Sequence, residues 1–64
     1  MTQRDLAIKD LEANGYMFDH HGGKHDVYRN QANQKIPLKR HDFDEDDRRY
    51  INKEIRLNKR RLFQ

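Results

Sequence analysis

Apolar positions near the N-terminus recur with helical spacing. The stretch "TQRDLAIKDLEANG" carries a modest apolar stripe made of Leu6, Ala7, Leu11 and Ala13. Thr2 precedes the stripe and Asp5 follows three residues later, which is a weak relative of the capping box. Gly15 is suited to the left-handed position that closes a helix. The pattern predicts a first helix that begins after Thr2 and ends at Asn14-Gly15.

Three short runs follow, each bounded by turn residues. They are "YMFDHH" (16–21), "HDVYRN" (25–30) and "KIPLKR" (35–40). Runs of this length between turn signals are typical of an antiparallel meander. Pro37 cannot donate to a strand ladder, so we expect the third strand at an exposed edge of the sheet.

The last part of the chain predicts a second helix. It starts near Asp42 or Asp44 and runs to about Leu57 or beyond, with Phe43 as an apolar anchor before it. The residues that fall on one face of this helix are Tyr50, Ile51 and Ile55.

The predicted order is therefore helix, three strands, helix, in one domain covering residues 1–64. Because neither a helix nor a sheet is stable alone, we expect both helices to cover one face of the sheet, in a two-layer α+β sandwich. The expected core is thin: Leu6, Leu11, Tyr16, Phe18, Val27, Ile36, Leu38, Phe43, Ile51 and Ile55.

Composition narrows the class of protein. A chain of 64 residues buries only about 60% of its unfolded surface and gains from a stabilising partner. The absence of cysteine excludes disulfides and thiolate metal sites. No apolar run approaches the ~20 residues of a membrane span, and the N-terminus lacks the apolar centre of a signal peptide. We expect a cytoplasmic protein that does not bind membranes.

Charge is distributed unevenly around the net value of +3. Residues 42–49 hold five acids and two arginines, and residues 50–64 hold five bases and one acid. Acids before bases suit the dipole of one long helix. The basic end could also approach phosphates, and the acidic segment could deter nucleic acid or contact a partner.

The stretch "GGKHDVYRN" places His25 just after a double glycine. If Gly22-Gly23 forms a two-residue turn, the opposed pairs are His21 with Lys24, His20 with His25, and Phe18 with Val27. His25 would then lie on the core side, at the rim of the sheet. A histidine at a strand end is nevertheless more often a surface residue than a catalyst.

A metal site is not expected. The four histidines are His20, His21, His25 and His41, and their spacing matches no standard ligand pattern. We therefore predict no metal and no cofactor.

Several short motifs in order resemble the HicA family of type II toxins. They are Gly15-Tyr16 after the first helix, Gly23-Lys24-His25 in place of a "G-S-H" motif, the following "DVYRN", and Ile36-Pro37 in the third strand. The resemblance covers nearly the whole chain. The chain departs from the family pattern at Lys24, where the family has serine, at Lys39, where a histidine is common, and at the acidic start of the last helix.

The resemblance implies a double-stranded-RNA-binding-like fold and an mRNA interferase, that is, an endoribonuclease toxin. It also implies His25 as the catalytic residue and a HicB-type antitoxin as the partner that covers the active site. Such an enzyme can cleave RNA by moving the 2′-hydroxyl onto the adjacent phosphate, which needs a base, an acid and positive charge. An imidazole can serve as base or acid near neutral pH.

We predict His25 as the proton-transfer residue and Lys24 as the nearest phosphate ligand. His20 is the candidate for a second proton-transfer group. Weaker candidates for RNA and phosphate binding are Arg29, Lys35 and Lys39, with Tyr28 as an exposed ring for stacking. The other aromatic residues, Tyr16, Phe18, Phe43 and Tyr50, could also serve as base-stacking platforms, but we expect them in the core instead.

Two alternatives remain open. A non-catalytic RNA-binding module of the same fold is favoured by Lys24 and Lys39 in place of serine and histidine. A protein-interaction module without nucleic acid is favoured by the modest net charge.

Overall fold

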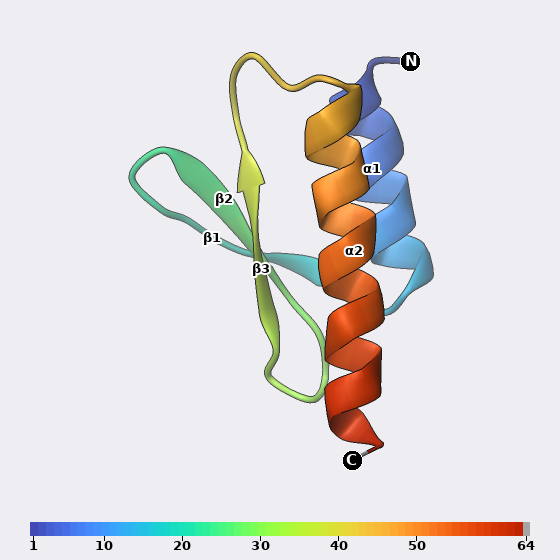
Figure 1. Cartoon of the computed structure of the whole chain (residues 1–64). Helices are drawn as coiled ribbons and strands as arrows, with labels where there is room; N and C mark the ends of the chain where they lie inside the picture. The colour runs from blue at the N-terminus through green and yellow to red at the C-terminus, as the bar shows by residue number, and fades with distance from the viewer. Residues whose placement is uncertain (64) are drawn as a thin grey trace.

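A computed structural model describes residues 1–63 and shows the predicted order of helix, three antiparallel strands and helix. Gln64, the last residue of the predicted domain, lies outside the described residues. The two helices pack against each other on one side of an open three-stranded sheet (Figure 1). The predicted α+β class is confirmed.

Helix α1 spans Gln3–Ala13 and begins with a complete capping box. The hydroxyl of Thr2 accepts a hydrogen bond from the backbone N–H of Asp5, and the Asp5 carboxylate accepts one from the backbone N–H of Thr2, both at 3.1 Å. These bonds satisfy two donors that the helix start leaves unpaired. Gly15 follows with a φ of 84°, a left-handed conformation that glycine adopts without steric cost.

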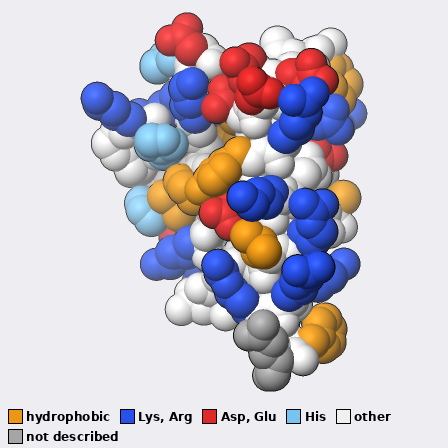
Figure 2. Space-filling model, viewed as in Figure 1, with side chains coloured by type: hydrophobic (Ala, Val, Ile, Leu, Met, Phe, Trp, Pro, Cys, Tyr) orange, Lys and Arg blue, Asp and Glu red, His pale blue; other side chains and the backbone are white. Residues whose placement is uncertain are grey.

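Helix α2 spans Glu45–Leu62 and is capped by Asp44, one of the two predicted starts. Asp44 and Asp47 form a second capping box. Acidic residues occupy the first turn and basic residues the last turn, which complements the helix dipole. The uneven charge of the sequence therefore has a structural cause, and in Figure 2 the acidic side chains gather over the start of α2.

The strands are β1 (Met17–His21), β2 (His25–Arg29) and β3 (Lys35–Lys39), in the order β1-β2-β3. Pro37 lies exposed on the edge strand β3, as predicted. Among the described residues, neither helix is long and apolar enough to cross a membrane.

The predicted register of the first hairpin is wrong. Gly22 donates its backbone N–H to the carbonyl of His25 at 2.8 Å, so the turn is centred one residue later than Gly22-Gly23. His20 therefore stands opposite Val27, and His21 opposite Asp26.

A bulge adds a second shift to this hairpin. The register changes between Phe18 and His20, so Phe18 stands opposite Tyr28 instead of Val27. An extra residue on one strand turns the residues beyond it to the other face. Phe18 thus shares a face with Tyr28, and their ring centroids lie 6.0 Å apart.

The core lies between the sheet and the two helices. Its buried apolar residues are Ala7, Leu11, Tyr16, Tyr28, Ile36, Leu38, Ile51 and Ile55. Phe43 packs against this core from outside, and Leu6 is half-buried. The core predictions for Phe18, Val27 and Leu6 are wrong, because Phe18 is 49% exposed and the other two are only half-buried and lie outside the buried cluster.

The pairing of β2 with β3 explains which residues of β2 face inward. Tyr28 stands opposite Ile36, and Asp26 opposite Leu38. Directly opposed residues share a face of the sheet. Because Ile36 and Leu38 are buried against the helices, Tyr28 and Asp26 also face inward. Val27 is consequently on the outer face.

Candidate functional site

His25 is the first residue of β2, next to the hairpin loop. Its side chain is exposed on the outer face of the sheet, opposite to the helices, and Val27 follows on that face. Across the ladder, His25 stands opposite Lys39. The predicted place at a strand end is confirmed. The predicted core-side orientation is wrong, because Asp26 and Tyr28 occupy the inward positions.

A groove of about 470 Å³ opens beside His25, and we call it the basic groove. Its lining residues are Gly23, Lys24, His25, Lys39, Arg40, His41 and Asp42. They come from the hairpin loop, the start of β2, the end of β3 and the connection that follows. Figure 2 shows histidine side chains on the sheet side of the molecule, with lysine and arginine side chains among them, and further lysines and arginines over the helices.

A second groove, of about 220 Å³, lies between β3 and α2, and we call it the aromatic groove. Its lining residues are His25, Pro37, Lys39, Phe43, Asp47, Tyr50 and Ile51. His25 and Lys39 line both grooves. The imidazole therefore lies where a cationic surface meets an apolar one.

Arg40 holds the hairpin loop that precedes His25. Its Nη2 donates to the carbonyl of Gly22 at 2.6 Å, and its Nη1 donates to that of Gly23 at 3.1 Å. Its Nε donates to Oδ1 of Asp26 at 2.8 Å. A planar guanidinium can make these bonds at once because its donors are arranged in a fixed fork. The loop and the start of β2 are thereby tied to the end of β3.

Asp26 is the centre of this network, and its side chain is mostly buried. Besides Arg40, it accepts hydrogen bonds from Nη2 of Arg4 in α1 and from Nδ1 of His21 in β1, both at 2.7 Å. The bonds from Arg40 and His21 lower the pKa of Asp26 to about 2. The buried carboxylate is tolerated because its charge is paired on several sides.

Lys39 is held from the α2 side. Its Nζ donates to the carbonyl of Asp42 at 3.1 Å and lies 3.4 Å from Oδ2 of Asp47. A hydrogen bond from the backbone of Asp44 lowers the pKa of Asp47, and Lys39 adds to this effect. Asp47 thus remains a carboxylate, and it partly neutralises Lys39, which lines both grooves.

The structure brings only some of the predicted site residues together. Lys24 and Lys39 line the basic groove with His25. His20 is exposed on the same sheet face as His25. The two residues are diagonal neighbours across the strand pair, for which the usual distance between Cα atoms is ~7–8 Å.

Arg29 and Lys35 stand opposite each other at the far end of the sheet. Lys35 lies four residues from Lys39, or about 13 Å along the strand. These two side chains therefore lie too far along the sheet to bind the same small anion as His25. Arg29 also pairs with Asp19 at 3.3 Å.

Tyr28 does not present an exposed ring. It is 7% exposed within the core, and burial raises the pKa of its phenol. The prediction of Tyr28 as a stacking ring is wrong, because the strand pairing turns it inward.

Sequence reasoning missed three residues of the grooves: Arg40, His41 and Tyr50. Arg40 and His41 directly follow Lys39, so the antiparallel pairing of His25 with Lys39 would have placed them near the imidazole. Tyr50 was expected in the core, yet it is 49% exposed.

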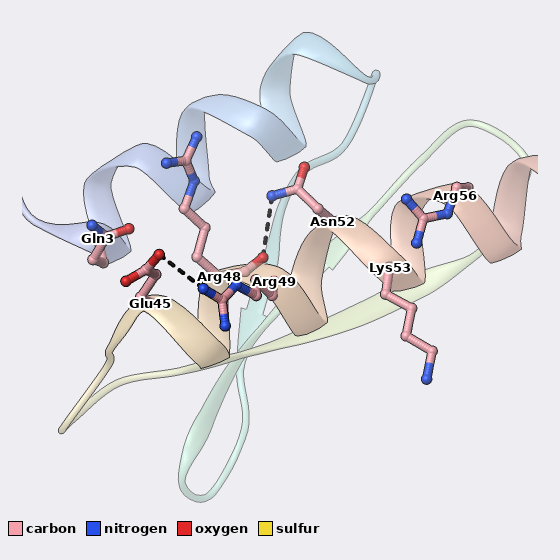
Figure 3. Close-up of a pocket in the computed structure, with 7 residues that line it drawn as sticks. All are labelled: Gln3, Glu45, Arg48, Arg49, Asn52, Lys53 and Arg56. Atoms are coloured by element: carbon pink, nitrogen blue, oxygen red, sulfur yellow. Dashed lines mark hydrogen bonds and ion pairs between the residues drawn. The ribbon is translucent and has the colours of Figure 1, made fainter.

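A larger pocket, of about 520 Å³, lies where α1 and α2 meet (Figure 3). Arg48 reaches from α2 towards α1, where its Nε donates to Oδ2 of Asp10 at 2.9 Å, and Asn52 donates to the same oxygen. Arg48 and Asn52 lower the pKa of Asp10. This pocket contains no histidine, the side chain that most often transfers protons near neutral pH.

Within residues 1–63 no three histidine, aspartate or glutamate side chains are arranged to hold a metal ion. Comparison with known proteins found no matching family model, no matching curated protein and no matching solved structure.

Proposed function

We propose that this protein is a ribonuclease that binds a single RNA strand in the basic groove and cleaves it with His25 as the proton-transfer residue. One observation carries the proposal: an exposed imidazole lies in a groove lined by Lys24, Lys39, Arg40 and His41. A groove with several cationic side chains attracts the phosphates of the RNA backbone.

The proposed reaction is attack of a ribose 2′-hydroxyl on the adjacent phosphorus. The new O–P bond forms as the bond to the 5′-oxygen breaks, leaving a 2′,3′-cyclic phosphate and a 5′-hydroxyl. His25 removes the proton of the 2′-hydroxyl or supplies one to the leaving oxygen. Lys24 places positive charge beside the phosphate, where charge develops in the transition state.

The second proton-transfer group has two candidates on this surface. His20 shares the sheet face of His25 and bonds through Nδ1 to Asp19 at 2.7 Å. His41 lines the basic groove itself. The position of His41 within the groove favours it over His20.

The biological role that we propose is that of a HicA-like toxin of a type II toxin–antitoxin system, with mRNA as substrate and a HicB-type antitoxin as partner. Its support is the order of helix, strands and helix together with the motif that places His25 at a strand start. The thin core agrees with a protein that gains stability from a partner.

The competing proposal is an RNA-binding module without catalysis. Lys24 beside His25 favours it, because a lysine there binds phosphate as a point charge without any proton transfer.

Incubating the purified protein with single-stranded RNA in EDTA tests both proposals. Cleavage that yields cyclic phosphate ends supports the ribonuclease. Salt-dependent binding without cleavage supports the binding module and withdraws the enzyme. Absence of both binding and cleavage contradicts both proposals and leaves a protein-interaction module.

A further inference from the structure

The aromatic groove has features that the proton-transfer chemistry does not use. Tyr50 presents a ring that is 49% exposed, and Pro37 and Phe43 add apolar walls. Tyr50 directly precedes the buried Ile51, so its side chain is turned out of the core, and it lines the same groove as Pro37 of β3. An exposed aromatic ring in a groove is a surface on which a flat ligand can stack.

Two residues connect this groove to the basic groove. His25 and Lys39 line both, so a ligand that fills the aromatic groove lies directly beside any phosphate held near His25. The basic groove favours an anionic chain, and the aromatic groove favours a flat, uncharged group attached to it. A nucleotide combines these two chemistries.

The size of the aromatic groove agrees with this occupant. Its volume is about 220 Å³, below the roughly 300–1,000 Å³ of pockets that enclose drug-sized ligands. One base fits this smaller scale. The negative charge of Asp47 at the groove is partly offset by Lys39, 3.4 Å away, which reduces its repulsion of a neighbouring phosphate.

We propose that the aromatic groove is a nucleobase subsite, in which Tyr50 stacks against one unpaired base of the RNA strand next to the phosphate at His25. This inference rests on the proposed RNA binding and adds a positioning role for Tyr50. It assigns to Tyr50 the stacking role predicted for Tyr28. Stacking accepts any base, because every base has an aromatic face.

The test measures binding of a short single-stranded 2′-O-methyl oligonucleotide to the full chain. This probe lacks the nucleophilic hydroxyl, so binding is read without cleavage. Tyr50→Ala should weaken binding roughly 5- to 150-fold, the range that loss of one stacked base corresponds to. Tyr50→Phe keeps the ring and should bind like the parent.

Phe18→Ala is the matched control. Phe18 is also 49% exposed, but it lies on β1 against His21, with ring centroids 4.8 Å apart, and lines neither groove. This variant should bind like the parent. An abasic strand of the same length should bind the parent and Tyr50→Ala equally.

Tyrosine fluorescence supplies a second readout that needs no variant. The chain has three tyrosines and no tryptophan, and Tyr16 and Tyr28 are buried, so quenching on binding reports on Tyr50. Equal binding by Tyr50→Ala and the parent, or absence of quenching, overturns the subsite. Quenching and binding without RNA cleavage would keep the subsite and withdraw the ribonuclease. RNA cleavage by the parent, with unchanged probe binding in Tyr50→Ala, would keep the ribonuclease and withdraw the subsite.

Discussion

Arg40 and Asp26 are joined by a hydrogen bond of 2.8 Å, and the same guanidinium reaches the carbonyl of Gly22 at 2.6 Å. The pair thus connects a buried carboxylate to the loop that precedes the proposed catalytic histidine. Positioning of His25 therefore depends on a contact that is distant in sequence and formed only in the folded chain.

We predict that Arg40→Lys loosens this loop. A lysine keeps the charge but cannot make the forked set of bonds, so the carbonyls of Gly22 and Gly23 lose their donors. Unfolding in urea should show a loss of about 1–3 kcal/mol, and amide exchange in the hairpin should quicken. Arg49→Lys alters an exposed arginine that pairs with Glu45 and should change stability by less than ~0.5 kcal/mol. Equal losses of stability in Arg40→Lys and Arg49→Lys would argue against the role of Arg40 in holding the hairpin loop.

Acid should destabilise the protein through Asp26. Its pKa in the folded protein is about 2, below the ordinary value of 3.8, so the unfolded chain binds the proton more tightly. The stability contributed by Asp26 is fully present above about pH 4 and is lost as the pH falls towards 2. Urea unfolding measured from pH 6 to pH 2 should show this loss.

Asp26→Asn isolates that contribution. The variant should be less stable than the parent at neutral pH, and the difference should shrink as the pH falls through this window. Asp46→Asn, which removes an exposed carboxylate on α2, is the control. A difference between Asp26→Asn and the parent that does not vary with pH would contradict the assignment.

A buried polar contact joins α2 to the start of β1. Nδ2 of Asn58 donates to the hydroxyl of Tyr16 at 3.0 Å, and both residues are buried. Tyr16→Phe leaves the amide of Asn58 without this acceptor and should cost about 1–3 kcal/mol in urea unfolding. Tyr50→Phe removes an exposed hydroxyl and should be close to neutral. Similar losses of unfolding free energy in Tyr16→Phe and Tyr50→Phe would mean that the bond between Asn58 and Tyr16 adds no stability beyond that of an exposed hydroxyl.

The two ends of the sheet should differ in RNA binding. Lys24→Ala removes a cation from the basic groove, so it should weaken binding of single-stranded RNA and reduce the slope of log K against log salt by about 0.7. Lys35→Ala changes a lysine at the far end of β3 and should have the smaller effect. Titrations at several salt concentrations compare them, and a larger effect at Lys35 would place the strand elsewhere on the sheet.

The elements of the fold could be predicted because their signals are local. Thr2 and Asp44 each cap a helix by exchanging hydrogen bonds with the residue three positions later. Gly15 follows α1 in a left-handed backbone conformation. Pro37 marks an edge strand because it has no N–H group, whatever its neighbours are.

The site was harder to predict because it depends on register. The bulge at Asp19 and the turn centred after Gly22 depend on hydrogen bonds that no short sequence motif predicts. Their effect is to separate Phe18 from Val27. An alternating strand such as "HDVYR" can bury either of its two sets of side chains. In this chain, pairing with β3 and the ion pairs of Asp26 with Arg4 and Arg40 determine which set is buried. Tyr28 belongs to the same set as Asp26 and therefore faces inward.

The proposed reaction depends most directly on His25. One comparison tests this role: the single-turnover cleavage rate of a single-stranded RNA in EDTA by the parent and by His25→Ala. Both proteins should share the same circular-dichroism spectrum and bind the 2′-O-methyl probe. We predict that His25→Ala cleaves at least about 100-fold more slowly, the lower end of what general acid–base catalysis contributes. Equal cleavage rates, or no cleavage by the parent, would contradict the claim that His25 moves the proton.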